Sequence, residues 1–311
     1  LTYKASPAQI GAFMIAHRIR RPEPQELAGM LDTYLNLGPK LLSKENQRRP
    51  LCFGMPFDGR KRTAPIYPLT ALILISAGQP VVLQGGARMP IKYGITTEEL
   101  FRALNLNLQK LTLKQVQRGF WENGIAFIYQ PDHFPLADNL NSYRDEIGKR
   151  STLASIELLW TAHRGKHLLV SGFVHPPTEM RAWKALSLMN EEDLITIKGS
   201  EGGIDLSTSK SCITGHIHDN QLNRLILHPR EHLCFEHEAK WEGLNTWKNQ
   251  ALQALENKGA LLKALRWNAG AYLWFAGITE TLNEGIELAA FHISSGLAKQ
   301  TLERLIIWRA K

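Results

Sequence analysis

The chain has 311 residues, of which 44% are hydrophobic and 21% are charged, as is typical of a globular protein with one large core or two modest domains. No run approaches eighteen apolar residues and no secretory leader is recognisable, so we expect a cytoplasmic protein without a membrane-spanning helix. The formal net charge of +8 favours phosphate-rich or other anionic partners, and a basic surface that serves solubility is the alternative.

The first 45 residues are expected to be helical. Ser6 and Pro7 have the pattern of an N-cap followed by a first-turn proline, and Pro22 and Pro24 end one helix and begin another. A polar linker, "SKENQRRP", follows at residues 43–50.

Beyond the linker, short apolar runs alternate with amphipathic segments, which predicts strands alternating with helices. Strands are expected at residues 51–55, 79–86, 124–130, 167–173, 193–199 and 223–229. The segments at 67–78, 96–106, 136–148 and 176–189, and nearly all residues after 246, are expected to be helical. This alternation predicts a largely parallel sheet covered by helices, with ligands outside the carboxyl ends of its strands.

The segment "GMPFDGRKRT", residues 54–63, follows the first strand of this alternation. Its glycines and Asp58 suggest a phosphate-binding loop, but Pro56 removes a backbone donor and Phe57 adds bulk. The basic trio Arg60, Lys61 and Arg62 suits a polyanion, and a solvated basic loop is the alternative. Further arginines that can extend this basic patch are Arg18, Arg20, Arg21, Arg48 and Arg49.

Residues 6–29 and 281–306 resemble the first two and the last two helices of the anthranilate phosphoribosyltransferases, which share their fold with the pyrimidine nucleoside phosphorylases. The resemblance implies an α/β fold with a small all-helical domain and a large α/β domain around a mainly parallel central sheet. It places the helical domain at 1–45 with an insertion at about 138–163, and the large domain at 46–137 and 164–311. It also implies a homodimer formed through the helical domains.

The substrate motifs of those enzymes are retained only in part. Their pyrophosphate loop reads Gly-Thr-Gly-Gly-Asp-Gly, of which Gly54, Asp58 and Gly59 match here. Their Lys-His-Gly-Asn-Arg motif becomes "LQGGA", in which Gly85 remains. Downstream, Lys92 matches a Lys-Ser-Gly motif, and Arg88 is a partial replacement for the missing arginine.

The resemblance also implies a second-ligand region and a metal site. His133 comes from the motif that reads "HFPLA" here, Arg144 falls where the enzymes place an arginine near the carboxylate of the aromatic substrate, and Arg150 also matches. The adjacent Asp-Glu pair that holds magnesium in the enzymes becomes Ile204 and Asp205. A single carboxylate makes a poor magnesium site.

A closer resemblance is to anthranilate-phosphoribosyltransferase-like proteins that keep the fold and the dimer, lack the enzyme motifs and bind nucleic acid; it rests on "FDGRKRTAPIYPL", "VVLQG" and "IKGSEG". It implies that single-stranded nucleic acid or another phosphate-rich ligand binds in the cleft. The alternative is an active anthranilate phosphoribosyltransferase of tryptophan biosynthesis that uses phosphoribosyl pyrophosphate, and magnesium is expected only then. Whether the chain is an enzyme stays open. Phe57 and Tyr67 are candidate base-stacking residues if they are exposed.

Cysteines and histidines give weak metal signals. Cys52, Cys212 and Cys234 lie far apart and are expected to be isolated thiols. Five histidines gather in residues 216–237, where His228 and His232 have the i, i+4 spacing of a helical metal pair. Pro229 lies between them, which favours ordinary surface histidines, and the role of this region stays open.

Overall fold

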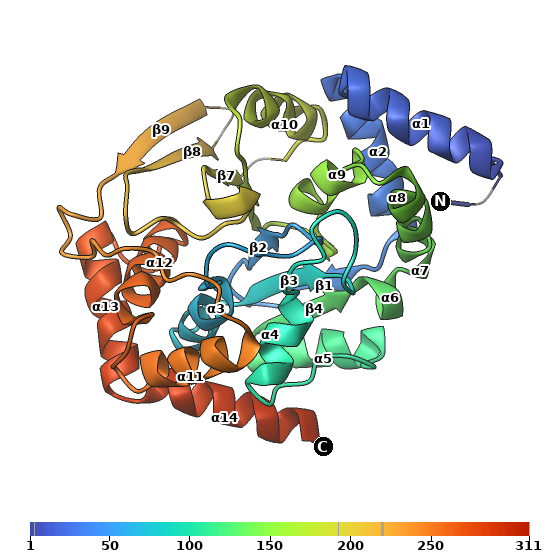
Figure 1. The fold of residues 1–311 in the computed structure, drawn as a ribbon. Coiled ribbons are helices and arrows are strands. Elements are labelled where there is room, and N and C mark those ends of the chain that lie inside the picture. Colours follow the sequence, from blue (N-terminus) through green and yellow to red (C-terminus); the bar gives the residue numbers. More distant parts are fainter. Residues whose placement is uncertain (3, 192, 219–220, 311) are drawn as a thin grey trace.

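The computed structural model describes residues 1–2, 4–191, 193–218 and 221–310. Four helices gather at one end of the molecule (Figure 1): α1 (Pro7–Arg20), α2 (Pro24–Leu37), α8 (Asn141–Ile147) and α9 (Leu153–Leu159). The Ser6 side chain accepts a hydrogen bond from the Gln9 backbone N–H, as the capping pattern predicts. α1 contacts α8 and α2 contacts α9, so the later insertion packs on the N-terminal helices, and the domain limits given above stay predictions.

Seven strands of the described chain form one sheet in the order β4-β3-β2-β6-β7-β8-β9. Five of them run parallel: β2 (Leu51–Gly54), β3 (Val81–Gly85), β4 (Ile125–Tyr129), β6 (Leu168–Gly172) and β7 (Asp193–Ile197). β8 (Cys212–His218) and β9 (Gln221–Leu227) are antiparallel additions at one edge. The mainly parallel sheet is confirmed. The sequence pattern misses β8, whose segment "CITGHIH" contains a glycine and two histidines rather than an apolar run.

A second, two-stranded parallel ladder lies between the helical end and the large sheet. It pairs β1 (Leu41–Leu42) with β5 (His163–Arg164). Both short strands carry the chain out of the helical end toward the large sheet, β1 after α2 and β5 after α9, and they run parallel to each other.

Helices cover the sheet and enclose its core. α3 (Tyr67–Ser76) is buried from Tyr67 to Ile75 because it contacts the C-terminal helices on the side away from the sheet, which explains a sequence that is apolar all round. The other helices are α4 (Thr97–Ala103), α5 (Leu113–Asn123), α6 (Gln130–His133), α7 (Pro135–Asp138), α10 (Pro176–Leu188), α11 (Leu244–Leu255), α12 (Leu262–Phe275), α13 (Leu282–Ser294) and α14 (Leu297–Ala310).

Two further observations concern the helices. The helix expected at 136–148 is divided between α7 and α8. Among the described residues, no helix combines the length and the apolar character that crossing a bilayer requires.

Candidate functional site

The loop after β2 lies at the carboxyl end of the parallel sheet, as expected. Gly54 ends β2, and a Cβ at this position would overlap the backbone carbonyl of Leu158 in α9. The glycine therefore permits close packing of α9 on the strand end, a structural reason for its presence that needs no phosphate.

The middle of the loop is filled by its own side chains. Met55 and Phe57 are each 3% exposed, and Tyr67, at the start of α3, is 2% exposed with its hydroxyl 3.0 Å from Thr97 Oγ1. Phe57 and Tyr67 are candidates for base stacking only if they are exposed, and this condition is not met here, because a stacking residue must present a ring face to the ligand.

Asp58 is a buried anchor for two cations. Lys92 Nζ lies 3.1 Å from Asp58 Oδ1, and Arg150 Nη2 lies 3.0 Å from the same oxygen. Lys92 also donates a 2.8 Å hydrogen bond to the Gly59 carbonyl oxygen, and burial lowers the pKa of its ammonium group. Gly59 has φ +77°, the left-handed conformation that glycine adopts without strain.

Arg60 points into the protein, which corrects the expectation that all three loop cations face a polyanion. Its side chain is 3% exposed, and Nη1 donates a 2.8 Å hydrogen bond to Asp205 Oδ2. A second hydrogen bond goes to Thr63 Oγ1, and Nε lies 3.6 Å from Glu201 Oε1. A buried guanidinium requires such carboxylate partners, so Arg60 holds the loop rather than a ligand.

Glu201 occupies the position that an anion would take at this loop. Its Oε1 accepts a 2.8 Å hydrogen bond from the Arg62 backbone N–H, and its Oε2 accepts a 3.1 Å hydrogen bond from the Lys61 backbone N–H. Burial alone would raise the pKa of this carboxyl, but these donors and Arg60 outweigh burial and lower it. The backbone N–H groups of the loop that could bind an anion thus donate their hydrogen bonds to a carboxylate of the same chain. The side chains of Lys61 and Arg62 remain exposed.

The residues aligned with the magnesium pair do not fit magnesium. Ile204 has no oxygen in its buried side chain, and the buried Asp205 carboxylate is held by Arg60 and by the Ile66 backbone N–H at 3.0 Å. Magnesium requires several oxygen ligands, and here a guanidinium already neutralises the one carboxylate. The weak expectation of a metal ligand at Asp205 is not supported by this geometry.

Most of the predicted second-ligand residues serve the fold. Arg144 and Glu157 form a buried ion pair in which each side chain is 2% exposed, so Arg144 is closed to a substrate carboxylate. His133 Nδ1 accepts a 3.0 Å hydrogen bond from the Tyr129 N–H, and its Nε2 lies 2.7 Å from the Leu111 carbonyl oxygen. Both ring nitrogens are therefore used internally.

The remaining predicted residues, Gly85, Arg88 and Arg150, differ in how exposed they are. Gly85 ends β3, where an added Cβ would lie 3.4 Å from the Phe127 ring. Arg88 is exposed and forms a 2.8 Å ion pair with Glu99. Arg150 is partly exposed, because only one edge of its guanidinium contacts Asp58. Of the second-ligand set, Arg150 is the residue that borders open space.

That space is a cavity of about 300 Å³ between α1, α9, α10 and the carboxyl end of β6. We call it the interdomain cavity. Its wall includes six basic side chains: His17, Arg18, Arg21, Arg150, His175 and Arg181. Glu179 also lines it, but this buried carboxylate is paired with Arg224 at 2.9 Å. Gly202 connects the wall to Glu201 and so to the loop after β2.

Comparison with known proteins assigns this chain to a protein family. The description "Glycosyl transferase family, a/b domain" matches residues 60–299, and the helical bundle domain of the same family matches residues 1–38. The chain belongs to this glycosyl transferase family. Within the family it is an anthranilate phosphoribosyltransferase-like member, since this is the name of its curated relatives.

Three relatives illustrate the likeness of this glycosyl transferase family member. The anthranilate phosphoribosyltransferase of Burkholderia cenocepacia (strain HI2424) is 24% identical over 305 residues, which are 97% of this chain and 88% of that protein. The crystal structure of the Thermus thermophilus enzyme has a TM-score of 0.80 at 21% identity, covering 99% of this chain and 92% of that one. The Saccharomyces cerevisiae enzyme in complex with PRPP and Mg has a TM-score of 0.81 at 16% identity, covering 98% and 85%.

Sequence reasoning missed the carboxylates that neutralise two of the predicted site arginines. Glu201 lies far along the chain from Arg60, and Glu157 follows Arg144 by 13 residues, so neither pair has a spacing that a local pattern would connect. In the histidine-rich region, His228 Nδ1 lies 2.8 Å from Ser211 Oγ and His232 Nδ1 lies 2.5 Å from Asn283 Oδ1, so this pair has separate partners.

Proposed function

We propose that the interdomain cavity binds a phosphate-rich ligand, and specifically single-stranded nucleic acid. The observation that carries this proposal is that Arg18 and Arg21 are exposed and have no ion-pair partner among the described residues. Both side chains line the cavity. Cations that lack internal partners are the ones available to phosphate groups.

The loop after β2 supports the same proposal in a different way. Pro56 and Phe57 occupy its middle and Glu201 takes its backbone donors, which leaves little room for a pyrophosphate. Lys61 and Arg62 nevertheless remain exposed beside Glu201. A strand that follows the cavity and passes over this loop would meet cations along its backbone and few groups that read its bases, so we expect little sequence preference.

The test is a salt titration of single-stranded DNA binding, measured by fluorescence anisotropy with an oligo-dT probe. Replacing Arg18 and Arg21 together by alanine should lower the slope of log affinity against log salt by about 1.4, since each phosphate contact contributes about 0.7. The matched control replaces Lys114 and Arg118, two exposed cations of α5 outside the cavity, and should leave the slope unchanged. Equal slopes for the wild type and the Arg18/Arg21 variant would refute this role of the cavity.

A second candidate is anthranilate phosphoribosyl transfer, which the comparisons favour over nucleic-acid binding, because the curated relatives carry that name. The geometry supports it less, since Arg60 and Glu201 occupy the loop and Ile204 and Asp205 do not fit magnesium. Loss of one preorganised active-site contact costs on the order of a hundredfold to a thousandfold in rate. We expect at most very weak turnover when anthranilate, phosphoribosyl pyrophosphate and magnesium are supplied. Robust magnesium-dependent formation of phosphoribosyl anthranilate would establish this candidate instead.

We also propose a homodimer through the helical end. An apolar groove of about 620 Å³ runs along α1 and α2, and Phe13 on its wall is 49% exposed. A second copy would cover this surface, which is costly to leave in water. Light scattering of the wild type should give twice the chain mass, and Phe13→Glu should shift the protein toward the monomer.

A further inference from the structure

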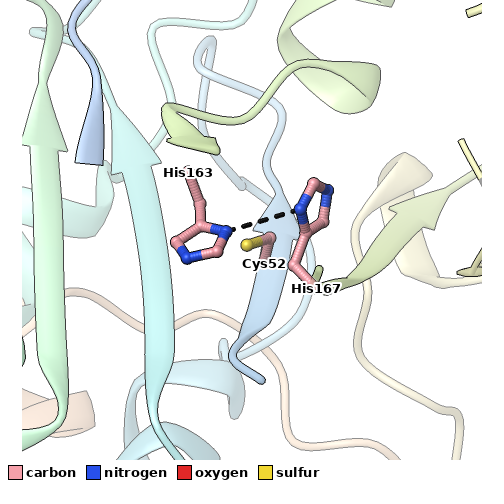
Figure 2. Close-up of side chains that lie close together, drawn as sticks. All are labelled: Cys52, His163 and His167. Carbon is pink, nitrogen blue, oxygen red and sulfur yellow. Dashed lines mark hydrogen bonds between the residues drawn. The ribbon is translucent and has the colours of Figure 1, made fainter. Parts of the chain in front are cut away.

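Three potential metal ligands meet at the end of the sheet opposite the interdomain cavity. Cys52 lies in the first half of β2, His163 begins β5, and His167 immediately precedes β6. One ligand atom from each side chain lies within 4.8 Å of the other two (Figure 2). Among the described residues this is the one such group of three, and it shares no residue with the sites discussed above.

The spacing of the two rings matches coordination of one ion. His163 Nδ1 and His167 Nδ1 are 3.5 Å apart, and Figure 2 shows the Cys52 sulfur beside the line that joins them. Two nitrogens bound to a tetrahedral zinc ion at about 2.0–2.1 Å are about 3.3–3.4 Å from each other. The rings therefore need little movement to share one ion.

The outer nitrogens of both rings face oxygen atoms, as they do in metal sites. Ser43 Oγ lies 2.9 Å from His163 Nε2, and Glu191 Oε1 lies 3.3 Å from His167 Nε2. A carboxylate or hydroxyl at the far nitrogen fixes the tautomer and orients the ring. His167 Nδ1 is also 2.8 Å from the Gly165 carbonyl oxygen, so metal binding requires that Nδ1 carry no proton and that the ring proton be on Nε2, which then donates a hydrogen bond to Glu191.

The three groups differ in how readily they lose a proton to a metal ion. Burial lowers the pKa of His167, but the hydrogen bond to Glu191 and its charge outweigh burial and raise this pKa, so a metal ion competes with a proton for this ring. Burial, with the neighbouring His167 and Arg164, lowers the pKa of His163 to about 4, so this imidazole carries a free lone pair at neutral pH. Burial raises the pKa of the Cys52 thiol well above its usual value. A bound cation would stabilise the thiolate and release the thiol proton to solvent, forming one metal–sulfur bond in place of one S–H bond.

We propose that Cys52, His163 and His167 bind a zinc ion through one sulfur and two nitrogens, with a fourth position for water. A thiolate and two imidazoles select zinc over magnesium or calcium, which prefer oxygen ligands. The ion would join β5 of the β1–β5 ladder to the central sheet at β2 and so hold these two segments together. It is independent of the function proposed for the interdomain cavity.

The test is a zinc titration of tag-free, full-length protein by isothermal calorimetry after treatment with a chelator. We expect one zinc ion per chain, and Cys52→Ser or His167→Gln should weaken binding by on the order of a hundredfold or more. Glu191→Gln, which alters a partner of a ligand, should weaken it by about tenfold to a hundredfold. The matched controls are Cys212→Ser and His292→Gln, a buried thiol and a buried imidazole elsewhere, which should bind zinc as the wild type does.

Cobalt binding by the wild type provides a test that does not require any variant to fold. Cobalt(II) bound to the wild type should show a sulfur-to-cobalt charge-transfer band, because one ligand is a thiolate. Absence of zinc binding by the wild type, absence of this band, or equal zinc affinity of wild type and Cys52→Ser would each overturn the proposal.

Discussion

The loop after β2 and the interdomain cavity both collect arginines, but the two regions treat these charges in opposite ways. In the loop, Arg60 is buried against Asp205 and Glu201. In the cavity, Arg18 and Arg21 are exposed, and neither has an ion-pair partner among the described residues. A cluster of basic residues in sequence is therefore not one functional unit.

The difference follows from the cost of desolvation. A guanidinium inside the protein must be neutralised, so the fold supplies carboxylates to Arg60, and that cation contributes to structure. An arginine at a cavity wall keeps its hydration and can exchange it for a phosphate. Variants test this contrast, because replacing the loop cation should affect stability and replacing the cavity cations should affect binding.

The largest effect is expected from Arg60→Met, which leaves Asp205 and Glu201 without their buried cation. Breaking a buried ion pair from one side typically costs about 3–5 kcal/mol in the free energy of unfolding, measurable by urea titration. Arg118→Met removes an exposed ion pair with Glu122 and should leave the free energy of unfolding almost unchanged. A similarly small loss for Arg60→Met would mean that Arg60 is free to contact a ligand.

Alanine substitutions at two glycines distinguish the cost of backbone strain from the cost of overpacking. Gly59 and Gly78 have φ of +77° and +78°, but only at Gly59 would a Cβ meet neighbours, 2.5 Å from the Gly94 carbonyl carbon. Gly78→Ala should cost about 1 kcal/mol from the left-handed conformation, and Gly59→Ala a further 1–3 kcal/mol or so from overpacking. Thermal unfolding followed by circular dichroism measures both, and equal losses would remove the packing role of Gly59.

Glu201→Gln tests the carboxylate that takes the place of an anion. The folded-state pKa of Glu201 is lowered, so its ionised form contributes stability above the ordinary pKa of 4.5, and this contribution is lost as the pH falls through the folded-state pKa. At pH 7 the variant should be less stable by about 1 kcal/mol, because an amide accepts weaker hydrogen bonds than a carboxylate does. The two proteins should converge in urea titrations as the pH is lowered below 4.5. A constant difference across this range would contradict the assignment, and Glu122→Gln on an exposed helix is the control.

The smallest effect on stability is expected from the joint replacement of Lys61 and Arg62 by alanine. Both side chains are exposed, so the free energy of unfolding should change by no more than about 0.5 kcal/mol. The same variant should lower the salt slope of single-stranded DNA binding by about 1.4 if the strand crosses the loop. An unchanged slope would restrict the binding surface to the interdomain cavity.

The local elements and the order in which they occur can be predicted from the sequence alone. Ser6 and Pro7 announce the start of α1, and the apolar runs of β2, β3, β4, β6 and β7 predict the parallel sheet, because capping and periodicity depend on residues a few positions apart. The position of the loop after β2, at a strand's carboxyl end, follows from the same alternation.

Which charges are neutralised and which side chains are in contact depends on the tertiary structure. Arg60 contacts Asp205 because the segments that follow β2 and β7 both lie at the carboxyl end of the parallel sheet, and Cys52 of β2 lies near His163 of the separate β1–β5 ladder. The sequence shows that Arg60 is charged but not whether its side chain is exposed to water. Its burial depends on which parts of the rest of the chain pack around it. Side-chain direction at a loop and contacts between distant segments are set by packing and desolvation of the whole fold, which no local pattern contains.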